Sequence, residues 1–157
     1  MRGKLLFVFA IAAVAAVLVP VASADKPSKE PAPFPPTLTG QYCADFMVQV
    51  NLVVNGEFAI TFGSGRAIVA GRFILEVINL ETEESVTVNV SGPVFFDASG
   101  EFVVLRGNSL LFGEAGDFGP GTPAQVVVTS GTATFQTGVP GYTLQGTSRD
   151  LCAELAA

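Results

Sequence analysis

The sequence predicts an all-β protein with a single antiparallel, barrel-like domain, and a two-sheet β-sandwich is the alternative. From residue 40 onward, short runs rich in Val, Ile, Phe and Thr recur between Gly, Pro and Asn residues. Residues 46–54 alternate, so that Phe46, Val48, Val50, Leu52 and Val54 share one face of a strand. Most connections are short, so an open meander would leave two unpaired edges. Closing the sheet removes these edges, and we therefore favour the barrel.

The first 24 residues have the pattern of a secretory signal peptide. Arg2 and Lys4 precede an unbroken apolar run over residues 5–19, and Ala22-Ser23-Ala24 has the form of a cleavage site. The run is shorter than the roughly 20 residues that a membrane-spanning helix needs. We therefore expect cleavage after Ala24, a secreted or cell-envelope-associated protein, and no later membrane span. An uncleaved N-terminal anchor is the alternative.

Charge excludes one class of partner. Without Arg2 and Lys4, 6 basic residues stand against 14 acidic ones, a net charge of −8. Nucleic acid binding requires a basic face, so this balance argues against it and fits a soluble exported protein.

Residues 25–39 contain five prolines, which favour extended conformations without backbone donors. This segment is predicted to be a disordered Pro-rich linker ahead of the domain at 40–157.

The strands of the domain are delimited by turn residues. Asn55-Gly56 is a strong hairpin signal after the first strand. Gly-containing stretches mark further breaks at residues 63–65 and at Gly131, and Val139-Pro140-Gly141 has the form of a turn. About eight to ten short strands are expected among eleven candidate segments, at 46–54, 57–62, 66–70, 72–80, 85–91, 93–97, 101–106, 109–113, 124–130, 132–137 and 142–148. Only the last turn, 152–157, resembles a helix.

The two cysteines lie at the two ends of the domain, in the similar motifs "YCADF" and "LCAEL". An exported chain meets an oxidising environment, where Cys43 and Cys152 form one pair. A redox pair is usually close in sequence, and the neighbouring acids Asp45 and Glu154 raise a thiol pKa rather than activate it. We therefore predict a structural disulfide. It would make the first and last strands neighbours and so close the barrel.

Candidate chemical groups are few. The chain has no His, which removes His-based catalysis and His ligands for zinc or haem, and we expect no catalytic residue, metal or cofactor. The longest connection, 113–123, carries Glu114 and Asp117 and would bind calcium or act as a lid, unless it is only a flexible loop. Arg106 shares its parity with Phe102 and Val104, so it would contact an anionic ligand if it points inward, although the turn-like "RGN" places it at a strand end.

The quoted motifs resemble a family. The signal peptide, "YCADFMVQV", "GRAIVAG", "LEVINLETEESVTVNVSGPVFF", "GDFGPG" and "RDLCAEL" are similar to uncharacterised secreted β-rich proteins of actinomycetes. The resemblance covers nearly the whole domain after the signal segment. It implies secretion, an all-β fold and the cysteine pair, and it assigns no activity.

Three functional hypotheses follow. Several strands are apolar on both faces, notably 72–80, 101–105 and 124–128, which indicates either a second covered face or a surface for a partner. The leading hypothesis is a secreted, non-catalytic barrel-like protein that binds a small apolar ligand. The first alternative is a cell-envelope structural or protein-interaction module, and the second is a cofactor-free barrel enzyme. The sequence leaves the oligomeric state open.

Overall fold

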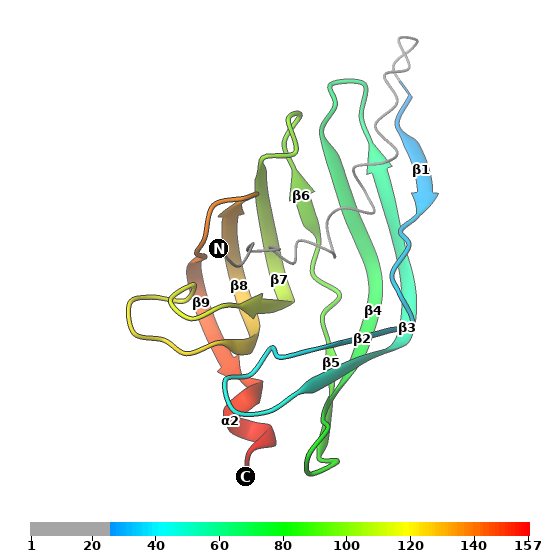
Figure 1. The fold of residues 1–157 in the computed structure, drawn as a ribbon. Coiled ribbons are helices and arrows are strands. Elements are labelled where there is room, and N and C mark those ends of the chain that lie inside the picture. Colours follow the sequence, from blue (N-terminus) through cyan, green and yellow to red (C-terminus); the bar gives the residue numbers. More distant parts are fainter. Residues whose placement is uncertain (1–25) are drawn as a thin grey trace, which may run out of the picture.

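The structure, a computed structural model, describes residues 26–157 as one antiparallel nine-stranded sheet and a short helix (Figure 1). The main strand order is β1-β3-β4-β6-β7-β8-β9, while β2 pairs with β3 beside β1 and β5 pairs with β4 beside β6. The predicted signal peptide lies outside the described residues. The elements are β1 Ser28–Pro31, β2 Thr37–Gly40, β3 Val48–Thr61, β4 Ala67–Asn79, β5 Ser85–Asn89, β6 Val94–Phe96, β7 Phe102–Gly113, β8 Gln125–Gln136, β9 Thr143–Asp150 and α2 Leu151–Leu155.

The all-β prediction is confirmed, but the sheet is not closed into a barrel. Within residues 26–157, β9 pairs only with β8, and no hydrogen-bonded ladder joins it to β1, β2 or β3. The disulfide does not require such a ladder. Cys43 lies in the connection between β2 and β3, and Cys152 lies in α2, so the bond joins segments outside the strands. In this part of the chain, no helix is long and apolar enough to cross a membrane.

Several predicted turns lie inside long strands. β3 runs through Asn55-Gly56, β4 through Gly71, β7 through Gly107 and β8 through Gly131. The predicted hairpin at Asn55-Gly56 and the predicted break at Gly131 are therefore wrong. Both errors have one cause, because a local pattern does not distinguish a glycine that reverses the chain from one that lets a strand bend.

The strand glycines form one line across the sheet. Gly107 pairs with Gly131, and Gly131 pairs with Gly146. β5 and β6 pair with β4 in the same register, so the intervening residue Gly92 lies opposite Gly71. Gly92 also lies beside Gly107, because a Cβ on Gly107 would be 3.6 Å from Gly92 Cα. We call Gly71, Gly92, Gly107, Gly131 and Gly146 the glycine row. It crosses the sheet from β4 to β9.

The main core lies on one side of this row. β6 joins β4 to β7 on one side of Gly92, whereas on the other side β5 pairs only with β4. The β3–β4–β5 and β7–β8–β9 parts of the sheet therefore separate at β5. Their facing apolar side chains pack together with α2. The buried members are Cys43, Phe46, Val48, Val50, Phe73, Leu75, Val77, Val88, Val90, Val126, Leu151 and Leu155.

A second, smaller core lies on the other face of β7. Leu110 and Phe112 pack against the main core, whereas Leu111 between them belongs to the second cluster, with Val103 and Leu105. Because successive side chains of a strand point to opposite faces, β7 is covered on both. In β8 the successive residues Val126 and Val127 are likewise both buried, which explains the apolar character of both faces in the predicted strand at 124–128. In the predicted strand at 101–105 only one face is buried, because Phe102 is 54% exposed.

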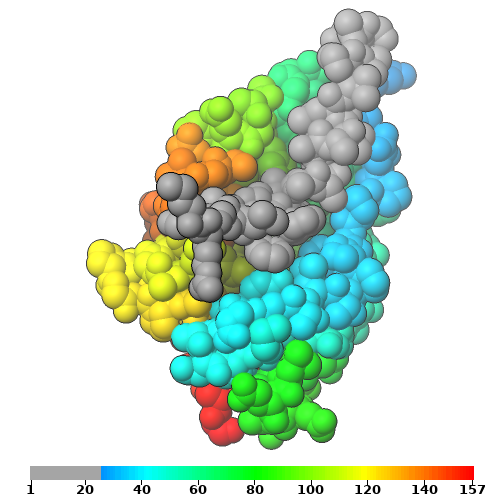
Figure 2. Space-filling model, in the orientation of Figure 1, coloured from blue at the N-terminus to red at the C-terminus, as the bar shows by residue number. Residues whose placement is uncertain are grey.

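Two short strands fall within the predicted Pro-rich linker. β1 and β2 lie along β3, and Phe34 between them packs edge-on against Phe73, with ring centroids 4.9 Å apart. Pro31 ends β1, and Pro36 accepts a backbone hydrogen bond from Leu52 at 2.9 Å. Proline removes a ladder donor, so the prolines separate the strands without preventing pairing. Figure 2 shows this segment, in blue to cyan, along one side of the molecule.

Candidate functional site

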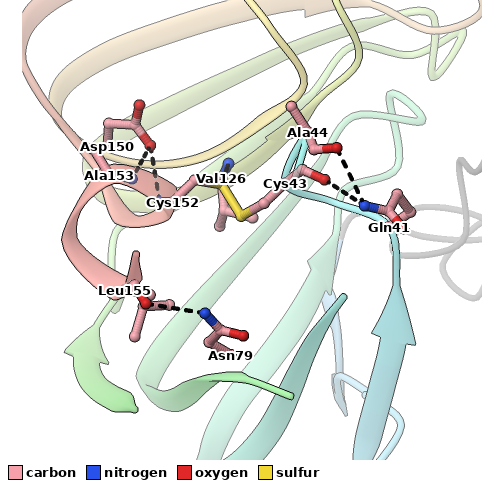
Figure 3. The surroundings of a disulfide bond; sticks show 9 residues. All are labelled: Gln41, Cys43, Ala44, Asn79, Val126, Asp150, Cys152, Ala153 and Leu155. Carbon is pink, nitrogen blue, oxygen red and sulfur yellow. Dashed lines mark hydrogen bonds between the residues drawn. A yellow bond between two sulfur atoms is a disulfide. The ribbon is translucent and has the colours of Figure 1, made fainter. Parts of the chain in front are cut away.

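The predicted disulfide between Cys43 and Cys152 is confirmed, and it lies in the main core (Figure 3). The Cα atoms are 5.6 Å apart and the residues are 109 positions apart in sequence. Asp150 caps α2, because its Oδ1 accepts hydrogen bonds from the backbone N–H groups of Cys152 and Ala153. Val126 N–H donates to Cys152 Sγ at 3.2 Å. The disulfide is therefore packed among core residues and backbone groups, as expected of a structural bond.

The three predicted ligand contacts do not form one site, because Arg106 lies on β7 and the two acids lie in the loop at 113–123. Arg106 is exposed on β7, and its guanidinium carbon lies 5.3 Å from the centroid of the Phe95 ring. Asp117 Oδ2 accepts a hydrogen bond from Glu114 N–H at 2.8 Å, so these two residues stabilise the turn of their own loop. Within residues 26–157, no ion pair joins Arg106 to either acid.

The loop at 113–123 packs against the sheet through aromatic contacts. Phe118 stacks on Tyr142 with ring centroids 5.0 Å apart, and the Tyr142 hydroxyl donates to Phe112 O at 2.8 Å. Burial, and secondarily the charge of Asp117, raises the pKa of Tyr142 to about 12. The described part of the chain contains no group of three or more Asp, Glu, Cys or His side chains placed to hold a metal ion.

Four partly exposed apolar side chains lie in direct register on one face of the sheet. Ile60 pairs with Ile68, Ile68 with Phe95, and Phe95 with Val104, across β3, β4, β6 and β7. Directly paired residues point to the same face, so we call these four the apolar row. With neighbouring strands about 4.8 Å apart, the row spans about 14 Å.

Two cations flank the apolar row. Lys29 pairs with Ile60, and its Nζ lies 4.2 Å above the ring centroid of Phe58, which shares the same face. Arg106 lies over Phe95 in the same way. A cation over an aromatic face is attracted by the ring quadrupole, which holds the charges beside the apolar surface.

A polar groove of about 340 Å³ lies where β5 separates from β7. Its lining includes Val88, Val128 and Arg149, and Arg149 forms an ion pair with Glu154 at 3.2 Å. The groove offers hydroxyl and amide groups to a small polar molecule. The remaining lining residues are Thr87, Asn89, Asn108, Thr129, Ser130, Thr147 and Ser148.

One carboxyl group has a strongly perturbed pKa. Burial raises the pKa of Glu57 to about 7. Glu57 lies on β3 directly opposite Gly71, at the end of the glycine row. Sequence reasoning missed this residue, because its burial depends on a pairing between β3 and β4 in a region that was predicted to contain turns.

The apolar row was also missed as a unit. Each of its residues belongs to a predicted strand, but their alignment requires the register of four strands. The parity of Phe95 and Val104 within their strands was the available signal.

Comparisons with protein-family models, curated proteins and solved structures found no match for this chain.

Proposed function

We propose that this chain is a secreted, non-catalytic protein-interaction module of the cell envelope, and that it binds another protein through the apolar row. The single observation that carries this proposal is the partial exposure of four aligned apolar side chains on one face of the sheet. A contiguous apolar patch rimmed by polar residues marks an interaction site more often than scattered apolar residues do.

The export part of the proposal rests on two observations. The N-terminal pattern is that of a signal peptide, and a disulfide forms and persists in oxidising compartments. We therefore place the protein outside the cytoplasm, in the medium or at the envelope.

The filled interior favours an interaction module over a carrier of small apolar molecules. Leu75, Val77 and Val126, from opposite parts of the sheet, are at most 2% exposed and pack in one core. A ligand-binding barrel would instead keep an apolar cavity of several hundred Å³. The groove beside β5 has the volume of a small site, but most of its lining residues are polar.

Glu57 favours the cofactor-free enzyme as a second candidate. A carboxyl with a pKa near 7 is suited to general acid–base catalysis. Such catalysis also needs a group that contacts the substrate beside it, and no side-chain hydrogen bond to the Glu57 carboxyl is present in residues 26–157. We therefore rank this function second.

The test of the interaction function uses the protein made by its own host. We expect wild-type protein in the envelope fraction, and we expect the Ile68→Glu/Phe95→Glu variant in the medium. Thr134→Glu is the matched control, because Thr134 pairs with Val104 at the polar end of the same row. Retention of the double variant in the envelope, or release of the control together with it, would contradict the proposal. A stoichiometric bound small molecule in native mass spectrometry would restore the carrier hypothesis.

A further inference from the structure

The face that carries the apolar row is basic, although the chain is acidic. Lys29, Arg72 and Arg106 lie on this face, and they are half of the 6 Lys and Arg residues in 26–157. Arg72 is on the same side of β4 as Ile68, because the two are an even number of residues apart within one strand. Two acidic residues share this side of the sheet, Glu76 further along β4 and Asp97 directly after β6, so the cations exceed the acids by three to two. The partner surface is therefore expected to combine apolar and acidic groups.

The chain itself presents such a surface at the other end of β4. The turn between β4 and β5 consists of residues 80–84, which we call the acidic turn. Leu80 is 43% exposed, and three glutamates follow it, Glu81, Glu83 and Glu84. Figure 2 shows this turn, in green, protruding beside α2.

The acidic turn is held in one conformation. The buried Asn79 accepts hydrogen bonds from Glu81 N–H through its side chain and from Glu83 N–H through its backbone, both at 2.9 Å. Asn79 Nδ2 also donates to Leu155 O at 3.0 Å, which ties the turn to α2. A preorganised turn loses little conformational freedom when it binds.

We infer that the basic, apolar face is covered by the acidic turn of a second copy of this chain. The inference rests on the proposed function and names the partner. Leu80 of the second copy would contact the apolar row, and its glutamates would pair with Lys29, Arg72 and Arg106. The face already holds its cations beside apolar surface, so burial of Leu80 and pairing of the glutamates would occur in the same contact.

The geometry makes this contact head-to-tail. The apolar row crosses β4 at Ile68 and the acidic turn follows Asn79, so the two surfaces are about 36 Å apart along one strand (Figure 1). They therefore cannot meet within one molecule. When the face of one copy binds the acidic turn of another, the turn of the first copy and the face of the second stay free. The expected product is an open chain of molecules rather than a closed dimer.

Charge reversal tests this contact. One variant carries Lys29→Glu/Arg72→Glu/Arg106→Glu, and the other carries Glu81→Lys/Glu83→Lys/Glu84→Lys. In sedimentation velocity at low salt, we expect wild-type protein to form species that grow with concentration and dissociate on adding salt, because exposed charges are screened. Each variant alone should sediment as a monomer. An equimolar mixture of the two should associate again, since the reversed turn matches the reversed face.

The control is Glu101→Lys/Glu114→Lys, which changes two exposed acidic residues outside the acidic turn and should associate as the wild type does. A monomeric wild type at every concentration would overturn the inference, as would association that survives both reversals or a mixture that stays monomeric. A monomeric wild type whose Ile68→Glu/Phe95→Glu variant still leaves the envelope fraction would refute self-association alone. The proposed function would then stand with a different partner.

Discussion

Gly131 of β8 and Gly146 of β9 lie directly opposite each other, and a side chain on either would meet the backbone of the partner strand. Their φ angles are +144° and +126°, which L-residues rarely adopt. A Cβ on Gly131 would collide with Gln145 O, and one on Gly146 with Ser130 O. The pair therefore allows the two strands to approach at the glycine row.

Gly131→Ala should destabilise the fold. The added methyl group would meet backbone atoms that cannot move without breaking the β8–β9 ladder, so we expect a loss of about 2 kcal/mol or more in the free energy of unfolding. Urea denaturation measures this loss. Gly63→Ala is the control, because a Cβ at that position would have no other group within 4 Å. Equal stability of the two variants would contradict the role of the glycine row.

Loss of the disulfide should cost much of the stability. Cys43 and Cys152 close a loop with a sequence separation of 109, for which the chain-entropy model gives about 4 to 5 kcal/mol. We expect the Cys43→Ser/Cys152→Ser variant to unfold at a much lower urea concentration than the unreduced wild type. Reductant should lower the wild-type midpoint and leave the variant unchanged. Two freely alkylated thiols in the unreduced protein, measured by intact mass, would refute the bond.

Asn79→Ala should destabilise more than a surface asparagine variant. Asn79 is 2% exposed, and the substitution would leave Leu155 O and Glu81 N–H without their partner. Losing the partner of a buried polar group costs about 1–3 kcal/mol. Asn51→Ala is the matched comparison, because the Asn51 hydrogen bonds are only partly buried, and its cost should stay below that of Asn79→Ala in the same urea titration. The reverse order would count against the buried role of Asn79.

Glu57 should make stability depend on pH. Its pKa rises from the ordinary value of 4.5 to about 7 in the folded chain, so between these values the folded state holds a proton that the unfolded state has lost. The stability contributed by this group is therefore fully present below about pH 4.5 and is lost as the pH rises through about 7. Glu57→Gln should reduce the loss of stability between about pH 5 and pH 8. Urea titrations at both pH values measure this, and an unchanged slope in the variant would contradict the burial of Glu57.

The strand content of the fold could be predicted from the sequence, but its connectivity could not. The alternation of Val48 and Val50 gave the correct buried face of β3, because it reflects burial on one side only. Val54 was predicted on the same face, which is wrong, because a register shift between Leu52 and Val54 moves it to the opposite face. Gly71, Gly107 and Gly131 carry no such signal. Whether a glycine with positive φ ends a strand or bends it depends on the neighbouring strand, which local sequence does not specify.

The cysteine pair was predictable because compartment and count leave one pairing for two cysteines. The apolar row and Glu57 were not predictable as sites. Ile60, Ile68, Phe95 and Val104 are adjacent only through the registers of three strand pairs, and the long-range pairing of β4 with β6 sets one of these contacts, that of Ile68 with Phe95. Arg106 was noticed for its charge, but its contact with Phe95 depends on the register of β6 with β7.

The disulfide also determines how the domain responds to mechanical load. Tension between the N-terminal segment and the C-terminal helix can peel β1 and β2 away from β3, but this peeling stops at Cys43. From there the force passes through the sulfur atoms into α2, and the seven strands between the cysteines carry none of it. The domain is thus a nearly inextensible link, which extends only by the residues outside the loop that Cys43 and Cys152 close.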